Sequence, residues 1–128
     1  GVIKIINLEK KYNLNNKKVN IDFAFIKKGF VSNGHYKIFI LGSPIIDSYI
    51  NFQLIVDTVY SNKLNTAFLK KIDGEFLIII VKEECVTIIN DRFSSIPLYY
   101  CIKNNKFNIS TSMLNMFKQL DDKNLKTE

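Results

Sequence analysis

The stretch from Asp73 to Tyr100 reads DGEFLIIIVKEECVTIINDRFSSIPLYY, and the rest of the fold can be arranged around it. Residues 77–81 and 86–89 are apolar runs rich in β-branched side chains, and a short link containing three charged residues joins them. This pattern predicts a β-hairpin. Neither run alternates between apolar and polar residues, so we expect both faces of the sheet to be covered. A third apolar run at 96–102 predicts a further strand.

The other segments predict an α+β domain with two stacked antiparallel β-sheets and flanking helices. The apolar period changes from that of a strand to that of a helix near residue 49, and the Asn33-Gly34 pair is a hairpin signal. Polar residues 9–19 are interpreted as a loop. The predicted strands are 2–6, 19–26, 36–41, 75–82, 85–91, 97–102 and 106–110, and the predicted helices are 49–60, 67–72 and 112–120.

The chain has 128 residues, of which 47% are hydrophobic, and this suits one domain with a substantial core. We expect that domain to cover residues 1–120, with residues 121–128 as a polar tail or the start of a linker. No apolar run approaches the roughly 20 residues that a membrane-spanning helix needs. The first residues also lack the pattern of a signal peptide. These features favour a cytoplasmic protein that does not bind membranes.

The formal net charge of +6 raises the possibility of nucleic-acid binding. However, the basic residues are almost all lysines in scattered pairs, and Arg92 is the one arginine. Nucleic-acid readers rely strongly on arginine for phosphate and guanine contacts. Nucleic-acid binding therefore stays the weaker alternative.

Two cysteines, Cys85 and Cys101, lie in or beside predicted strands, and His35 is the one histidine. Two cysteines do not make a zinc site, so no metal site is expected. A Cys–His pair for nucleophilic catalysis needs a close approach that sequence does not reveal. The simpler interpretation is that both thiols are buried and behave as small hydrophobic groups. A cysteine-dependent amidohydrolase remains an alternative.

Residues 69–120 resemble the N-terminal glutaminase domain of asparagine synthetase and its relatives. That family has Gly-x-Phe opening a strand, Arg-Asp-Arg at a strand end, a Gly, Pro-Leu-Tyr-Tyr, and Phe-x-Ser-Glu before a helix. The order and the gaps of these motifs agree with those in this chain. The corresponding residues here are Gly74, Phe76, Asp91, Arg92, Pro97, Leu98, Tyr99, Tyr100 and Ser112, with Met113 in place of the Glu.

The resemblance extends more weakly upstream and implies an Ntn-hydrolase-like sandwich. Leu41-Gly42-Ser43 stands where the family has Asn-Gly-Glu, and Asn51-Phe52-Gln53 stands where it has Asp-Thr-Glu. Gly1 aligns with the residue after the catalytic N-terminal cysteine of the family. Each motif residue also has a purely structural interpretation. Asp91 and Arg92 would form an ordinary surface ion pair, and Pro97 would fix the entry of an edge strand.

The residues that carry the family's chemistry differ in this chain. In the family an N-terminal cysteine attacks the glutamine amide, and its own α-amino group acts as the base. The oxyanion-hole asparagine corresponds to Leu41, whose side chain donates no hydrogen bond. The aspartate that holds the glutamine ammonium group corresponds to Asn51. No arginine is available to hold the glutamine carboxylate, because Arg92 belongs to another motif. We therefore expect no glutaminase activity and no catalytic residue.

Degenerate domains of this kind resemble those of β-lactam synthetase and of lasso-peptide macrolactam synthetases. The resemblance implies a scaffold or interaction module for an ATP-dependent, amide-forming synthetase domain or subunit. No cofactor is expected in this chain, and ATP and Mg²⁺ would belong to the synthetase partner. The expected contact surface, for that partner or for a homodimer, is Met113, Leu114 and Phe117 on the last helix, together with the Pro-Leu-Tyr-Tyr strand before it. Alternatively, this amphipathic helix covers the domain's own sheet. A stand-alone module that binds peptides or proteins is the alternative.

Overall fold

The computed structural model describes residues 8–13, 18–22, 29–82, 85–103, 105–112, 114 and 118. The chain divides into two compact units. Unit 1 comprises Gly1–Asn13 and Lys28–Ile96, and unit 2 comprises Leu14–Lys27 and Pro97–Glu128. Each unit has its own sheet, and the two are described separately.

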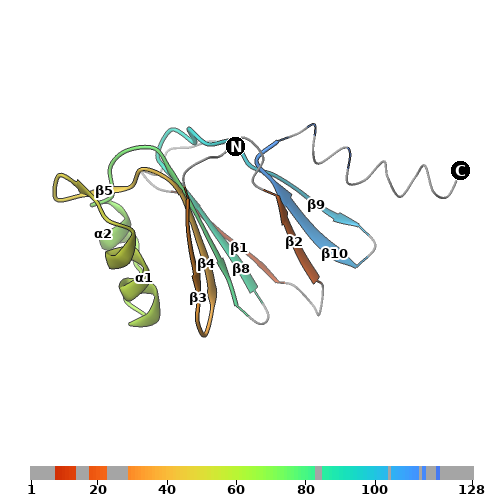
Figure 1. The fold of residues 1–128 in the computed structure, drawn as a ribbon, viewed down its shortest axis with the longest axis horizontal. Coiled ribbons are helices and arrows are strands. Elements are labelled where there is room, and N and C mark those ends of the chain that lie inside the picture. Colours follow the sequence, from red (N-terminus) through yellow and green to blue (C-terminus); the bar gives the residue numbers. More distant parts are fainter. Residues whose placement is uncertain are drawn as a thin grey trace, which may run out of the picture. The chain divides into compact units, whose positions relative to one another are not determined.

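Unit 1 contains a five-stranded sheet in which every pair of neighbouring strands is antiparallel (Figure 1). The β7–β8 hairpin predicted from the two apolar runs forms the middle of the sheet, and the β3–β4 hairpin turns at Gly34 as its sequence predicts. In sheet order, the strands are β1 (Leu8–Asn13), β8 (Cys85–Asn90), β7 (Phe76–Val81), β4 (Lys37–Gly42) and β3 (Gly29–Asn33).

Both faces of β7 are buried, as its continuous apolar sequence predicts. Phe76, Ile78 and Ile80 point to one face and belong to a single hydrophobic cluster. Leu77 and Ile79 point to the opposite face and are also fully buried. A central strand covered on both sides needs apolar residues at every position, and for this reason the sequence does not alternate.

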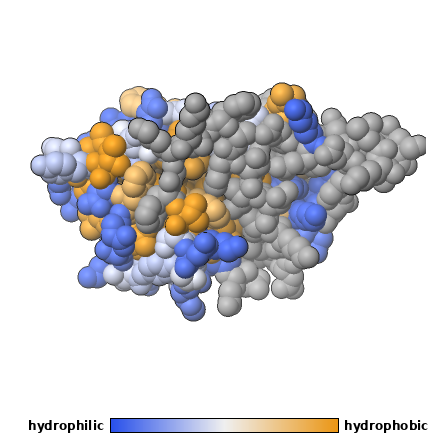
Figure 2. All heavy atoms as spheres, in the orientation of Figure 1, coloured by the Kyte–Doolittle hydropathy of each residue, from blue (hydrophilic) through white to orange (hydrophobic). Residues whose placement is uncertain are grey.

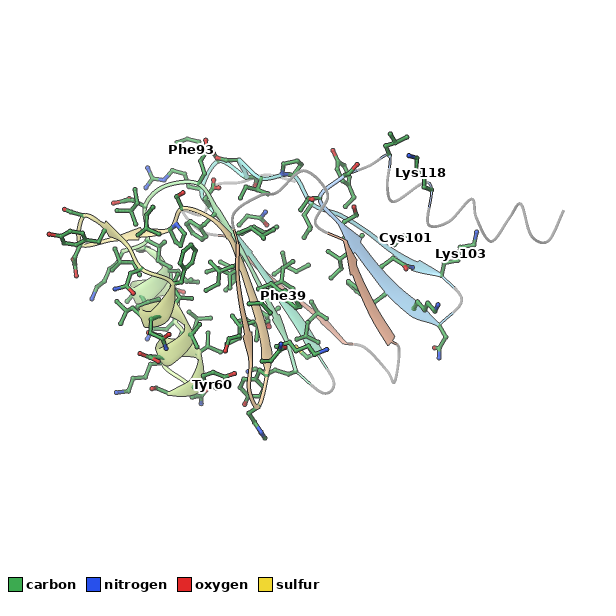
Figure 3. The ribbon with its side chains drawn as sticks, viewed as in Figure 1. Phe39, Tyr60, Phe93, Cys101, Lys103 and Lys118 are labelled. Atoms are coloured by element: carbon green, nitrogen blue, oxygen red, sulfur yellow. The ribbon has the colours of Figure 1, made fainter. Side chains whose placement is uncertain are left out.

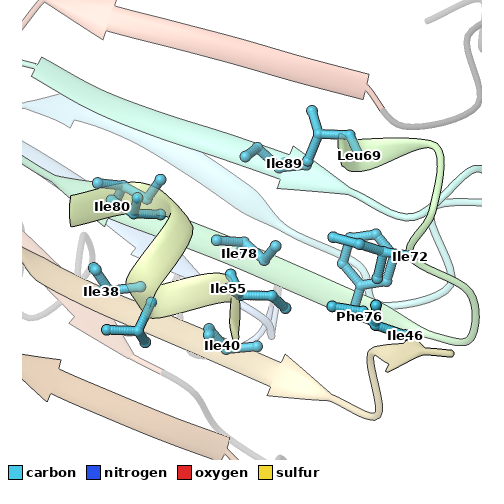
Figure 4. Close-up of a cluster of buried hydrophobic side chains, with 12 residues drawn as sticks. Ile38, Ile40, Ile46, Ile55, Leu69, Ile72, Phe76, Ile78, Ile80 and Ile89 are labelled. Carbon is cyan, nitrogen blue, oxygen red and sulfur yellow. The ribbon is translucent and has the colours of Figure 1, made fainter. Parts of the chain in front are cut away.

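Two helices cover the first face of this sheet. They are α1 (Phe52–Tyr60) and α2 (Thr66–Leu69). Asn51 and Asn65 cap them, since each side chain accepts a hydrogen bond from a backbone N–H of the first turn. Figure 4 shows the resulting cluster, in which helix side chains meet sheet side chains. Its buried members are Ile38, Ile40, Ile46, Ile55, Val56, Val59, Leu69, Ile72, Phe76, Ile78, Ile80 and Ile89.

The main helix begins later than predicted. Tyr49–Ile50 forms strand β6, which pairs with β5 (Ile45–Ile46) in a short hairpin. Asp47 and Ser48 form its turn and both have positive φ angles. The helix starts only at Phe52 because Asn51 has a non-helical backbone (φ −139°, ψ 88°) and its side chain makes the hydrogen bond of a cap.

Unit 2 contains a three-stranded sheet with the order β2 (Lys18–Asp22), β10 (Lys106–Ser110), β9 (Tyr99–Lys103). The β9–β10 hairpin is antiparallel, but β10 pairs with β2 in parallel. The prediction of purely antiparallel sheets is therefore wrong for this pair. The two strands are distant in sequence, so no tight turn requires them to run in opposite directions.

Other boundaries correct the sequence predictions in detail. Residues 9–19, predicted as a loop, contain most of β1 and the start of β2, and Gly29–Asn33 forms a strand that was not predicted. The predicted strand 97–102 begins at Tyr99, and the second helix is shorter than 67–72. The predicted strand 2–6 and residues 121–128 lie outside the described residues, as does most of the last helix. The α+β class itself is confirmed. Among the described helices, none has the length and apolar character to cross a membrane.

Candidate functional site

A buried carboxylate lies at the end of β8 and joins two of the family-like motifs. Asp91 is only 2% exposed. Its Oδ2 accepts a hydrogen bond of 3.1 Å from the backbone N–H of Phe76, the first residue of β7. Its own N–H donates to the carbonyl oxygen of Phe76, also at 3.1 Å. The Gly74-Glu75-Phe76 motif and the Asp91-Arg92 motif are therefore locked together at one end of the five-stranded sheet.

The same carboxylate organises the loop that follows it, residues 92–95. Asp91 Oδ1 accepts hydrogen bonds from the Phe93 N–H at 2.9 Å, the Ser95 N–H at 3.2 Å and the Ser95 hydroxyl at 3.1 Å. The Ser94 N–H donates to the Asp91 carbonyl oxygen at 3.0 Å. A side chain that only accepts satisfies several backbone donors here. The prediction that Asp91 forms an ordinary surface ion pair is wrong, because the group is buried.

The loop carries two exposed side chains at its tip. Phe93 is 79% exposed, and the guanidinium carbon of Arg92 lies 5.8 Å from the centre of its ring. Figure 3 shows Phe93 at one end of the sheet, far from Tyr60 at the end of α1. Sequence reasoning placed Arg92 in a motif but did not identify Phe93 or the serines that close the loop. The polar Ser94-Ser95 break was the available signal.

Two glycines bring a second loop against this end of the sheet. Gly42 and Gly74 both have positive φ, near +84° and +89°. A Cβ on Gly42 would overlap the carbonyl oxygen of Glu75, and a Cβ on Gly74 would overlap that of Ser43. The Ser43 N–H donates to the Glu75 carbonyl at 2.7 Å. Only residues without a side chain allow this close approach. The Leu41-Gly42-Ser43 segment is thus held directly beside the Gly74 motif.

Leu41, which the sequence resemblance predicts to correspond to the family's oxyanion-hole asparagine, is a core residue in the structure. Its side chain is buried, and it lies opposite Leu77 in the β4–β7 pairing. A leucine side chain has no hydrogen-bond donor and cannot stabilise a developing oxyanion.

Asn51, which the sequence resemblance predicts to correspond to the family's aspartate for the substrate ammonium group, caps a helix in the structure. Its Oδ1 accepts a hydrogen bond of 2.9 Å from the Leu54 N–H and caps α1. Its own N–H donates to the Pro44 carbonyl at 3.1 Å. The side chain is uncharged, so it supplies no countercharge for an ammonium group. The side-chain oxygen of Asn51 already accepts the capping hydrogen bond from Leu54.

The Pro-Leu-Tyr-Tyr motif and Ser112 lie in unit 2. Pro97 is exposed and precedes β9, which is an edge strand of the three-stranded sheet. Tyr100 is half exposed and its ring stacks on that of Phe107 at 5.6 Å. Ser112 is buried, and its N–H donates to the Ser110 hydroxyl oxygen at 3.0 Å. Leu98 and Tyr99 are half-buried.

The two thiols are free and half-buried, so they are less buried than predicted. Cys85 Sγ lies 3.8 Å from Thr87 Oγ1. Within the described ranges, no cluster of histidine, cysteine or acidic residues has the arrangement of a metal site. Of the predicted contact surface, Leu114 is 59% exposed. Gly1, Met113 and Phe117 lie outside the described residues.

Comparison with known proteins agrees with the motifs that meet at Asp91. A family model described as "Glutamine amidotransferase domain" matches residues 46–119, which is more than half of the chain. The match includes the Gly74, Asp91 and Pro97 motifs. No curated protein and no solved structure gives a significant match. On the strength of the family match, the chain belongs to the glutamine amidotransferase domain family.

Proposed function

We propose that this chain is a non-catalytic glutaminase-like domain of the asparagine synthetase superfamily. It would act as a scaffold or interaction module for an ATP-dependent, amide-forming synthetase domain or subunit in the cytoplasm. The observation that carries the proposal is the contrast between two sets of residues. The residues that build the end of the sheet are intact and hydrogen-bonded, whereas those that would bind and polarise glutamine are replaced.

The replaced positions support the loss of glutaminase chemistry on physical grounds. Removal of a single oxyanion-hole donor lowers catalytic rates by roughly 10²–10³-fold in other hydrolases. Leu41 is buried in the core and offers no donor. Asn51 is neutral and caps α1. A substrate site that lacks both an oxyanion donor and an ammonium countercharge binds neither the ground state nor the transition state well.

The retained positions support a structural role. Asp91, Gly42 and Gly74 hold three chain segments of unit 1 at one end of the sheet. Leu114 supports a contact with a partner. Its side chain is 59% exposed, and burial of that apolar surface in an interface would be favourable. ATP and Mg²⁺ would bind to the synthetase partner, and no cofactor is assigned to this chain.

The proposal is tested by co-expressing the chain with an ATP-dependent, amide-forming synthetase domain of the asparagine synthetase superfamily. The expected results are co-purification and an increase in ATP-dependent amide formation over the synthetase domain alone. Leu114→Asp should weaken the association, and Val31→Asp, the same kind of change at a residue on β3 that is 52% exposed, serves as the matched control. Failure of the two proteins to associate, or an association that Leu114→Asp leaves unchanged, would contradict this assignment.

A further inference from the structure

We propose that two copies of this chain associate through the end of the five-stranded sheet where the loop 92–95 and the hairpin 45–50 project. In the complex, the Arg92–Phe93 tip of one copy contacts the Asp47–Tyr49 tip of the other. A twofold axis makes this contact twice. The inference stands apart from the proposed scaffold role, because it concerns self-association and needs no synthetase partner.

The first tip has the properties of an interface anchor. Phe93 is 79% exposed, and Arg92 lies over its ring. The loop is held closed by the buried carboxylate of Asp91, which fixes the Phe93 and Ser95 N–H groups. An aromatic ring on a rigid loop loses little conformational entropy on binding. Arginine and aromatic residues are also enriched in the cores of interfaces.

The second tip offers the complementary chemistry. Tyr49 is 75% exposed and Ile50 is 54% exposed, and both belong to β6 of the hairpin 45–50. Asp47 is the single charged residue of that hairpin, just as Arg92 is the single charged residue of the loop 92–95. Asp73, also exposed, bridges to Ile45 and adds negative charge beside β5. The first tip carries an aromatic ring and the cation Arg92, and the second carries an aromatic ring and the anion Asp47. The two tips are therefore complementary in charge.

The pairing of the strands places both tips at the same end of the sheet. Gly42, the last residue of β4, lies opposite Phe76, and Asn90, the last residue of β8, lies opposite Leu77. Phe76 and Leu77 are neighbours at the start of β7, so β4 and β8 both finish at the same end of the sheet. The hairpin follows β4 and the loop follows β8. A twofold axis beside this end of the sheet brings the first tip of one copy to the second tip of the other. A self-complementary contact of this type is the commonest in homodimers.

The two tips come from different connections of the sheet, because one follows β4 and the other follows β8. Figure 2 shows hydrophobic side chains interspersed with hydrophilic ones over the described part of unit 1. The proposed contact consists of the aromatic anchors Phe93 and Tyr49 and the Arg92–Asp47 ion pair. A contact of such small area gives a weak, reversible dimer. Added salt should weaken it further, because the ion pairs lie near solvent.

The test is sedimentation velocity on the full chain, from micromolar to near-millimolar concentration. The expected result is a monomer–dimer equilibrium. Phe93→Ser and Tyr49→Ser should each raise the dissociation constant at least about tenfold, because each anchor occurs twice in the dimer. Val31→Thr, at a residue that is 52% exposed but lies on β3, should leave it unchanged. Circular dichroism establishes that each variant is folded.

A double-mutant cycle tests the ion pair itself. Arg92→Gln and Asp47→Asn should each weaken the dimer by roughly threefold, and asparagine tolerates the positive φ of position 47. The double variant should be no weaker than either single variant, because both changes remove the same contact. A chain that stays monomeric at every concentration would overturn the proposal. A dimer unaffected by either serine variant, or additive effects of the two neutral variants, would also overturn it.

Discussion

Asp91 and Phe76 are joined by two hydrogen bonds of 3.1 Å, one through the Asp91 side chain and one through its backbone N–H. The first fixes the start of β7 to the end of β8, and the other oxygen of the carboxylate closes the loop 92–95. A single side chain thus connects the two motifs that carry the family resemblance within unit 1. All of these hydrogen bonds are made to groups of the chain itself.

Removal of this carboxylate should destabilise the fold strongly. Asp91→Ala leaves the N–H groups of Phe76, Phe93 and Ser95 without their acceptor, and a cost of about 2–4 kcal/mol in the free energy of unfolding follows. Asp91→Asn should cost less because one carbonyl oxygen remains. Urea denaturation measures both. The control Asp57→Ala changes an exposed carboxylate on α1, and a similar loss there would contradict the structural role of Asp91.

Gly42 should tolerate no side chain. Gly42→Ala combines a positive φ with an overlap against the Glu75 carbonyl, and the free energy of unfolding should fall by about 2 kcal/mol or more. Gly34→Ala is the matched control. Its Cβ would meet only the hydroxyl end of Tyr60, which can move away, so thermal denaturation should show a smaller loss. Equal losses at the two glycines would show that the close approach at Gly42 is unimportant.

Replacement of Ser94 by glycine should stabilise the fold. Ser94 has a φ of +50°, in the left-handed region that favours glycine. Ser94→Gly relieves the strain of the left-handed backbone but increases the entropy of the unfolded chain. The first effect should be the larger, so the free energy of unfolding should rise by about 0.5–1 kcal/mol. Asn62→Gly, at a φ of +57°, should change it little, because asparagine already tolerates this conformation. Destabilisation of Ser94→Gly in urea would contradict a left-handed backbone at position 94.

Asn51 should prove to be a helix cap rather than a substrate ligand. Asn51→Ala removes the acceptor for the Leu54 N–H and should cost about 1 kcal/mol. Asn51→Asp keeps a capping oxygen and adds a charge that favours the helix N-terminus, so the stability should be retained or slightly raised. The same variant should still release no ammonia from glutamine. A gain of glutaminase activity in Asn51→Asp would contradict the capping interpretation.

The parts of the fold predicted from sequence are those in which burial dictates residue type. The runs 77–81 and 86–89 form a central hairpin whose two faces are both covered, and this requires the continuous apolar pattern that the sequence displays. The strand at Leu8–Asn13 was missed because its sequence, LEKKYN, is largely polar. Such a strand lies at the edge of a sheet, where lysines are common and pairing with β8 supplies the order.

The candidate site was predicted only in part. The motif residues were identified from their order, but an acidic residue at a strand end ordinarily indicates solvent exposure, so the burial of Asp91 was not anticipated. Its burial depends on the donors from Phe76, Phe93 and Ser95, which only the folded chain brings together. The parallel pairing of β2 with β10 was missed because distant strands leave no signal of direction in the sequence.

The most direct test of the central claim is ammonia release from glutamine by the purified chain. We predict a rate equal to that of buffer alone, for the chain and for its iodoacetamide-treated form alike, since neither Leu41 nor Asn51 supplies the groups that the reaction needs. Release of ammonia above buffer that iodoacetamide abolishes would show a working thiol nucleophile and would contradict the claim that the domain is non-catalytic.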